Sequence, residues 1–226
     1  MTELINIVLE HPDFLVVDKP ANVNFHDEGD LGQGFFNQCM NQYGYTLYPV
    51  HRLDKVTSGL VIMAKTLEAA QWFQLAFADK QIIKFYIAVT DQKPKKKQGT
   101  IKGDMAKARR GQWKLLKTKV SPAVTRFHTV PLTQPGSRLF LLKPETGKTH
   151  QLRVAMKSIS APILGDELYS GSNSDRVYLH ATRLVFNYKD QNIDLIRLPN
   201  SGQVFLEDQL KIESVVEQLL ELNWPS

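Results

Sequence analysis

Residues 51–65 read HRLDKVTSGLVIMAK. Ionisable side chains fill four of the first five positions, and a continuous apolar run of strand length, GLVIMAK, follows at 59–65. An uninterrupted run of this kind predicts a strand that is buried on both faces. Charges in a solvated loop would need no explanation, but these lead directly into a buried strand. The stretch therefore predicts both the centre of a sheet and a candidate site beside it.

The segments on either side extend the sheet. The patterns predict strands at 5–10 and 14–20, a helix at 34–43, a helix from Thr66 to about Asp79, and a strand at 82–89. Further along, they predict strands at 123–130 and 137–144 around a Pro-Gly turn, a helix at 149–160, strands at 177–186 and 193–198, and a closing helix at about 207–223. Runs of strands with irregularly placed helices predict an α+β fold, built on a mixed, largely antiparallel central sheet flanked by helices and loops.

Length and composition limit the class of protein. At 226 residues the chain is long enough for one large domain, which we expect to span 1–226. The single cysteine, Cys39, excludes an intrachain disulfide and a metal site built from cysteines. The N-terminal segment lacks the pattern of a signal peptide, and no apolar stretch approaches the roughly 20 residues of a membrane span. We expect a soluble, cytoplasmic monomer.

Positive charge is concentrated in one segment. Residues 93–119 hold eleven Lys or Arg and one acid, Asp104, so this basic insertion carries +10 while the rest of the chain carries −5. A solvated surface is one explanation, and an anionic membrane or an acidic protein are possible partners. With Trp113 among the cations, the segment is also typical of a surface that binds the phosphate backbone of a nucleic acid.

Several catalytic motifs are missing from the sequence. It has no P-loop, no paired histidines at zinc spacing, no Gly-rich dinucleotide fingerprint and no Gly-x-Ser-x-Gly elbow. The chemistry-bearing segments that remain are the turn with Asp54, ETGKTHQLR at 145–153, and KFY at 84–86. This inventory suits acid–base or nucleophilic work by one carboxylate backed by a cation.

HRLDKVTSGLVIMAK resembles the catalytic signature of the RluA-type pseudouridine synthases. Further blocks resemble that family in the same order: FLVVDKPANVNFH, KFYIAVT, TGKTHQLRVAM, APILGDELY and LHATRL, over roughly 14–183. The resemblance implies an isomerase with a central catalytic cleft. Such an enzyme converts uridine in structured ribosomal or transfer RNA to pseudouridine, without a cofactor or metal.

The resemblance also implies the catalytic residues. Asp54 would be the catalytic aspartate, and Arg153 would pair with it. An opposite charge within about 4 to 6 Å lowers a carboxylate pKa by roughly 1 to 3 units and would keep Asp54 ionised. Tyr86 would stack on the target base. The histidines at 51, 150 and 180 are expected to position neighbouring groups.

Other residues are implied to hold the substrate. Because uracil inside a helix must be flipped out to react, Arg52 would fill the gap that it leaves. Leu152 and Leu179 would form the apolar wall around the base, and Lys55 and Lys148 would contact phosphate. The residues expected along the RNA backbone are Lys95, Lys96, Lys97, Arg109 and Arg110. Lys148 stands where the family usually has arginine, and Asn22 where it usually has glycine.

Other functions are also compatible with parts of the sequence. A catalytically silent RNA-binding module would need the basic insertion, but would give no reason to keep Asp54, Tyr86 and Arg153 together. A sugar hydrolase would normally use two cooperating acids. Glu145 and Asp166 are available, although nothing in their spacing singles them out. A protein-binding role explains the net charge and little else.

Overall fold

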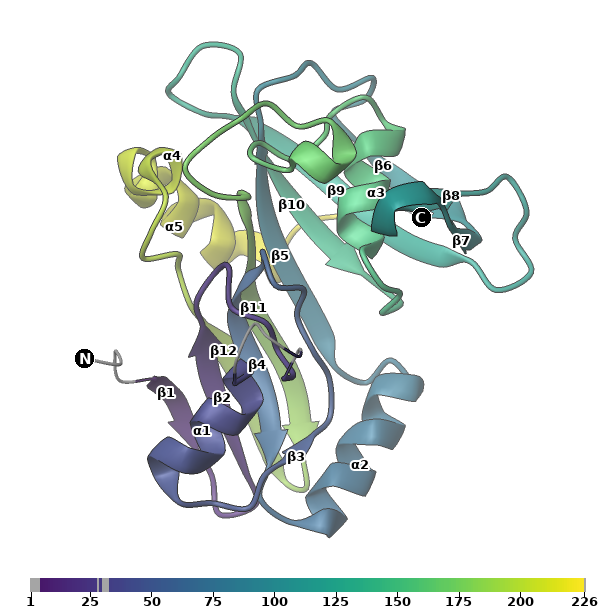
Figure 1. The fold of residues 1–226 in the computed structure, drawn as a ribbon. Helices are drawn as coiled ribbons and strands as arrows, with labels where there is room; N and C mark the ends of the chain where they lie inside the picture. Colours follow the sequence, from purple (N-terminus) through teal and green to yellow (C-terminus); the bar gives the residue numbers. More distant parts are fainter. Residues whose placement is uncertain (1–4, 28, 30–32, 226) are drawn as a thin grey trace.

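The computed structural model describes residues 5–27, 29 and 33–225. The domain predicted over 1–226 also includes residues 1–4, 28, 30–32 and 226, which lie outside this description. Within the described ranges, ten strands form one sheet and two more form a small hairpin beside it (Figure 1). The strands are β1 (Asn6–Glu10), β2 (Phe14–Lys19), β3 (Tyr48–Pro49), β4 (Ser58–Ala64), β5 (Ile83–Thr90), β6 (Gln98–Gly103), β7 (Met105–Lys107), β8 (Trp113–Leu115), β9 (Ala123–Pro131), β10 (Arg138–Pro144), β11 (Leu179–Tyr188) and β12 (Gln191–Ile196).

The large sheet is mixed but mostly antiparallel. Its order is β1-β2-β4-β11-β5-β10-β9-β6, with β12 beside β11 and β3 beside β4. Among the described strands, β4 and β11 form the one parallel pair, and the β7–β8 hairpin is separate. The predicted α+β class and largely antiparallel sheet are confirmed.

Helices cover both faces of this sheet. They are α1 (Phe35–Tyr43), α2 (Leu67–Ala78), α3 (Gln151–Ser158), α4 (Gln203–Glu207) and α5 (Gln209–Glu217), with short 3-10 turns η2 (Arg109–Gly111), η3 (Glu167–Tyr169) and η4 (Gln218–Leu220). No helix in the described part of the chain has the length and apolar character needed to cross a membrane.

The closing helix is shorter than predicted. The sequence pattern predicts one helix over about 207–223, and the structure has α5 and the 3-10 turn η4 there, over 209–220, with the short α4 just before them. Asp208 lies between α4 and α5, and its carboxylate accepts hydrogen bonds from the Thr133 backbone N–H and hydroxyl. This contact therefore marks the start of the closing helix and separates it from α4, which the sequence pattern did not predict.

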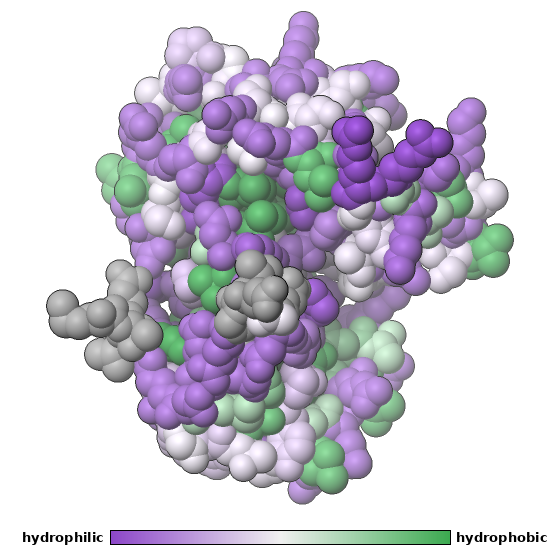
Figure 2. Space-filling model, viewed as in Figure 1, coloured by the Kyte–Doolittle hydropathy of each residue, from purple (hydrophilic) through white to green (hydrophobic). Residues whose placement is uncertain are grey.

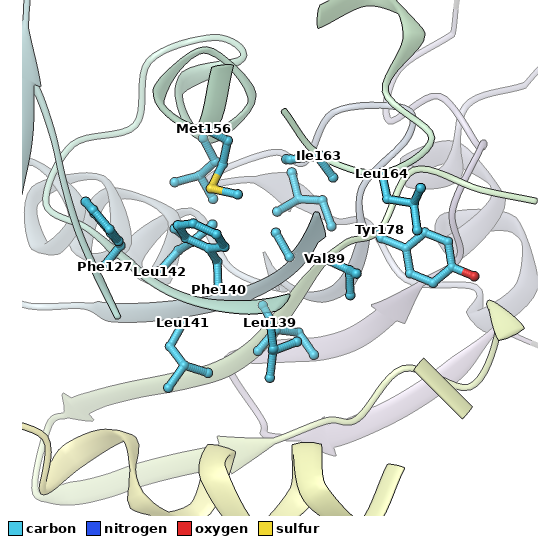
Figure 3. Packing of buried hydrophobic residues seen from close by; sticks show 14 of the residues in the cluster. Val89, Phe127, Leu139, Phe140, Leu141, Leu142, Met156, Ile163, Leu164 and Tyr178 are labelled. Carbon is cyan, nitrogen blue, oxygen red and sulfur yellow. The ribbon is translucent and has the colours of Figure 1, made fainter. Parts of the chain in front are cut away.

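The packing around β10 follows the two-residue period of a strand. Figure 3 shows Phe140 and Leu142 pointing towards Met156 of α3, while Leu139 and Leu141 point to the opposite face, towards the C-terminal helices. All five side chains are at most 2% exposed. Full burial of each such side chain stabilises the folded state by about 1.5 to 3 kcal/mol.

The apolar run of β4 is explained by cover on both faces. Leu60 and Ile62 pack in the cluster that contains α2, whereas Val61 and Met63 pack in the cluster that contains α1. A strand with both faces covered needs no polar alternation. The turn at 51–57 is therefore anchored to a rigid central strand.

Gly59 allows β4 to approach β11 closely. The pair aligns Ser58 with His180 and Gly59 with Ala181. The φ of Gly59 is 111°, and a Cβ there would collide with the backbone of Ala181. Only glycine meets both conditions, so the TSG sequence brings the end of the charged turn against the middle of the sheet.

The basic insertion occupies two places rather than one. Its first lysines lie in the turn between β5 and β6, at one end of the sheet, and the rest extend over β6 and the β7–β8 hairpin beside α3 (Figure 1). Figure 2 shows hydrophilic side chains gathered over the corner that the hairpin occupies.

Candidate active site

A cleft lies over the middle of the sheet. Its volume is about 440 Å³, and it is lined by the turn at 50–54 with Thr57, the end of α2, β5, the loop leading into α3, and Leu179 of β11. Asp54, Tyr86, Arg52, Lys148 and Leu152 are among its lining residues. Five of the predicted substrate and catalytic residues, together with Leu179, therefore share one cavity.

Asp54 lies in a tight turn just before β4. Its backbone carbonyl accepts a hydrogen bond from the Thr57 N–H at 3.0 Å. Its carboxylate is 21% exposed, so it remains reachable from the cleft. His51 fastens the start of the same turn, because its Nε2 accepts the Ile62 N–H at 2.8 Å. Burial lowers the pKa of His51 to about 3, so this imidazole is neutral near neutral pH.

Lys19 binds the Asp54 turn through its backbone carbonyls. Its side chain is fully buried, and its Nζ donates to the backbone carbonyls of Pro20 (2.9 Å), Thr57 (3.0 Å), Lys55 (3.2 Å) and Asp54 (3.5 Å). Burial lowers the pKa of Lys19 to about 7, although the negative Asp54 opposes the shift. A single side-chain nitrogen thus binds the backbone carbonyls of Asp54, Lys55 and Thr57.

The arginine predicted to pair with Asp54 has a closer partner. Arg153 Nη1 lies 3.9 Å from Asp54 Oδ2, but its Nε and Nη2 each donate to an oxygen of Asp166 at 2.7 Å. Burial disfavours the charged guanidinium, yet the hydrogen bonds and charge of Asp166 outweigh it and raise the pKa of Arg153. Asp166 therefore orients Arg153 through a planar, bidentate contact and leaves one edge directed at Asp54.

Tyr169 supports the same guanidinium. The Arg153 guanidinium carbon lies 4.9 Å from the centre of the Tyr169 ring, a cation–π geometry. The Tyr169 hydroxyl accepts the Trp113 backbone N–H at 2.9 Å and lies 2.8 Å from His150 Nδ1. His150 caps α3 with a left-handed φ of 55°. Arg153 is thus connected through Tyr169 to both the loop before α3 and the β7–β8 hairpin.

Tyr86 supplies the aromatic surface of the cleft. It is half-buried on β5. Burial, assisted by the negative charge of Asp54, raises the pKa of Tyr86, so its phenol is protonated near neutral pH. With Leu152 and Leu179 it forms an apolar slot beside a carboxylate. Such a slot can hold a flat aromatic base with its sugar near Asp54.

The remaining predicted residues lie in different surroundings. Arg52 and Lys148 line the cleft, whereas the Lys55 side chain is exposed and its carbonyl serves as a Lys19 acceptor. Arg109 and Arg110 lie exposed in the β7–β8 turn. Lys95, Lys96 and Lys97 lie exposed in the β5–β6 turn, together with Lys93. Within the described ranges, no three His, Cys, Asp or Glu side chains are grouped so that they could hold a metal ion.

Sequence reasoning missed Lys19, Tyr169 and the role of Asp166. Lys19 had one local signal: it shares its strand face with Leu15 and Val17, which predicts an inward-pointing side chain. Asp166 and Tyr169 lie in an irregular segment that carries no periodic signal.

Comparison with known proteins agrees with the geometry. The sequence pattern of the family described as RNA pseudouridylate synthase matches residues 13–158, more than half of the chain. A Haemophilus influenzae protein described as "Uncharacterized RNA pseudouridine synthase" is 49% identical over 207 residues, covering 90% of this chain and 91% of that protein. Ribosomal large subunit pseudouridine synthase C of Rickettsia prowazekii is 30% identical over 189 residues, covering 79% of this chain and 62% of that protein.

A solved structure shares the fold. Human RNA Pseudouridylate Synthase Domain Containing 1 superposes with a TM-score of 0.77 at 23% identity, covering 99% of this chain and 98% of that chain. At 23% identity, this similarity shows that the two chains share a fold.

Proposed function

The chain belongs to the RNA pseudouridine synthase family of RluA type and is an isomerase, and from this premise we propose that it isomerises specific uridines in ribosomal or transfer RNA with Asp54 as the catalytic residue. One observation carries the proposal. The Asp54 carboxylate is 3.9 Å from the Arg153 guanidinium and lines a cleft that Tyr86 also lines.

The reaction rearranges bonds without net addition or loss of atoms. The bond from ribose C1′ to uracil N1 breaks, a bond from C1′ to C5 forms, C5 releases a proton and N1 gains one. The Asp54 carboxylate acts as a nucleophile or stabilises positive charge that develops on the sugar or ring. Arg153 places a positive charge 3.9 Å from the Asp54 carboxylate, and Asp166 holds Arg153 in place.

Side chains that line the cleft hold the target uracil and the RNA next to it. Tyr86 stacks on the uracil, and Leu152 and Leu179 exclude water around it. Arg52 fills the space that the flipped base leaves in the RNA, which offsets part of the few kcal/mol that extrusion costs. Lys148 meets a neighbouring phosphate, and Lys55, on the outside of the turn, contacts the backbone. The exposed cations at 95–97, 109 and 110 bind the RNA backbone more generally.

Ribosomal RNA is the first RNA to examine. The name of the Rickettsia relative refers to the large ribosomal subunit, although this chain spans 62% of that relative's length. The choice of uridine depends on the shape of the RNA around it.

Asp54→Asn tests the proposal. Cells without this gene would be supplied with the wild-type chain, Asp54→Asn, or Asp190→Asn, which alters an exposed aspartate in the turn between β11 and β12. Pseudouridine would then be mapped in total RNA. We expect one or more sites to depend on the wild-type chain, to be lost with Asp54→Asn and to be kept with Asp190→Asn. Asp54→Asn should keep the wild-type melting temperature, and its affinity for RNA should stay within about two-fold of the wild-type value.

The same experiment separates the enzyme from an RNA-binding module. Pseudouridine that persists at wild-type levels with Asp54→Asn would remove Asp54 from the catalytic role. A map unchanged by loss of the gene, with RNA binding retained, would favour the catalytically silent module.

A further inference from the structure

A second cavity opens beside the catalytic cleft. Its volume is about 450 Å³, and its walls include Met105 of β7 and Trp113 of β8. It shares Gly147, Lys148 and Thr149 with the cleft. The two cavities therefore meet along one short loop, and nothing in the proposed function uses the second one.

The second cavity combines an aromatic wall with a basic setting. Trp113 and Met105 are both half-buried, so part of each side chain faces the cavity. Asp104 is the one acid within 93–119. Its carboxylate oxygens already accept the Val120 N–H at 2.9 Å and the Ser121 N–H at 2.8 Å. Asp104 thus holds the cavity wall and is balanced in the lining by Lys148, while the exposed Lys107, Arg109, Arg110 and Lys114 of the same hairpin supply the positive charge around it.

Lys148 lies where the two cavities join. Its Nζ donates to the hydroxyl of Ser121, on the wall of the second cavity, at 3.2 Å. Two successive nucleotides of an RNA strand are linked by one phosphate. Two cavities with a shared lysine match this pattern, because one base can enter each cavity while the phosphate lies at the amine.

On the basis of the proposed function, we propose that the second cavity binds the RNA nucleotide next to the target uridine, with its base stacked on Trp113 and the linking phosphate on Lys148. Aromatic stacking in a basic groove binds any base, because every base has a π-face. The cavity can therefore hold any base next to the target uridine. Binding there sets the register of the strand, that is, which nucleotide lies at Asp54.

The wall that carries Trp113 is fixed relative to the catalytic residues. The Trp113 backbone N–H donates to the Tyr169 hydroxyl at 2.9 Å, and the Gln112 side-chain amide donates to the Leu168 carbonyl at 2.7 Å. Tyr169 in turn lies against Arg153. A base held on Trp113 thus sits at a set position relative to Asp54, and this is what a register-setting site needs.

A pair of probes with equal charge tests the inference. The first is an oligouridylate of about a dozen nucleotides, within the range of single-strand binding sites. The second is the same ribose-phosphate chain without bases. Affinity for each would be measured for the wild-type chain, Trp113→Ala, Trp113→Phe and Lys114→Ala. Lys114 is an exposed neighbour on β8 and serves as the matched control.

The inference predicts a base-dependent loss. Trp113→Ala should weaken binding of oligouridylate roughly ten-fold and leave binding of the base-free chain unchanged. Trp113→Phe should keep most of the affinity, and Lys114→Ala should weaken both probes equally. The Trp113 backbone contact to Tyr169 survives both substitutions at 113, and equal melting temperatures would confirm the fold.

Other outcomes would overturn the inference. Equal losses on both probes with Trp113→Ala, no loss on either, or failure of the wild-type chain to prefer oligouridylate would each show that no base is seated on Trp113. Binding does not require turnover, so this failure is distinct from failure of the proposed function, which appears as an unchanged pseudouridine map.

Discussion

Lys19 is the residue that sequence reasoning overlooked beneath Asp54. Replacing it by methionine keeps the length of the side chain but removes the amine that donates to the carbonyls of Pro20, Asp54, Lys55 and Thr57. Buried carbonyls without donors cost free energy. We expect Lys19→Met to lower the free energy of unfolding by about 2 to 3 kcal/mol and kcat by at least about ten-fold. Lys211→Met, on the exposed face of α5, is the control. Unchanged stability and turnover would show that the turn holds itself.

Asp166 determines how Arg153 meets Asp54. In Asp166→Asn, an amide replaces the carboxylate and cannot accept both guanidinium N–H groups, so Arg153 loses its orientation. We expect kcat to fall about 10- to 100-fold and stability to fall by roughly 3 kcal/mol. Asp194→Asn is a matched control, because Asp194 holds Arg183 in a similar bidentate contact on the β11–β12 pair, at 2.8 and 2.7 Å. The control should lose stability but not turnover. Equal kcat in both variants would contradict a positioning role for Asp166.

At the scale of elements, the basic insertion is divided between two turns. The alanine variants to compare are a triple change at Lys95, Lys96 and Lys97 and a double change at Arg109 and Arg110. Each phosphate contact to single-stranded RNA contributes about 0.7 to the slope of log affinity against log salt. We expect both variants to bind RNA more weakly, with the slope reduced by about 1 to 2. Titrations across a range of salt concentrations measure this, and unchanged slopes in both would leave the insertion as a solvated surface.

At the scale of the whole molecule, His180 couples folding to pH. It lies on β11 in the middle of the sheet and is 1% exposed. Its Nδ1 lies 2.7 Å from the Ser58 hydroxyl, and its Nε2 lies 2.9 Å from the Arg197 carbonyl. The Arg176 guanidinium donates to the same Ser58 oxygen. Burial, reinforced by the positive Arg176 and Arg197, lowers the pKa of His180 from its ordinary 6.5 to about 3.

The sign of the pH dependence follows from proton binding. Between pH 6.5 and about 3, the unfolded chain binds a proton at His180 and the folded chain does not, so stability is full above 6.5 and falls as the pH is lowered. From about pH 7 to about pH 5, this group alone should cost about 2 kcal/mol. Denaturant titrations of wild type, His180→Gln and His180→Asn measure it. Both variants should show a pH dependence smaller by that amount, and an unchanged dependence would contradict the prediction.

Local patterns were sufficient for much of the fold. The apolar run of β4, the alternation in β10 and the capped helix after Thr66 are encoded within short segments, because each residue's face follows from its own strand or helix period. The helix predicted at 149–160 appears as α3 (Gln151–Ser158), and its Arg153 lies close to Asp54. The closing helix predicted at about 207–223 is found over 209–220, whereas the short α4 before it was not predicted, because its separation at Asp208 depends on a contact with Thr133, far away in the sequence.

The α+β class, the buried central strand, the family, and Asp54, Tyr86 and Arg153 as candidate residues could all be predicted from sequence patterns. The folded chain was needed to show that Asp166 is the closer partner of Arg153, that Lys19 binds the carbonyls of the Asp54 turn, and that a second cavity shares Lys148 with the cleft. Hydrogen bonds and cavities join groups from strands that meet only after the sheet has formed. Nothing in the spacing of residues along the chain records which side chains will then be neighbours.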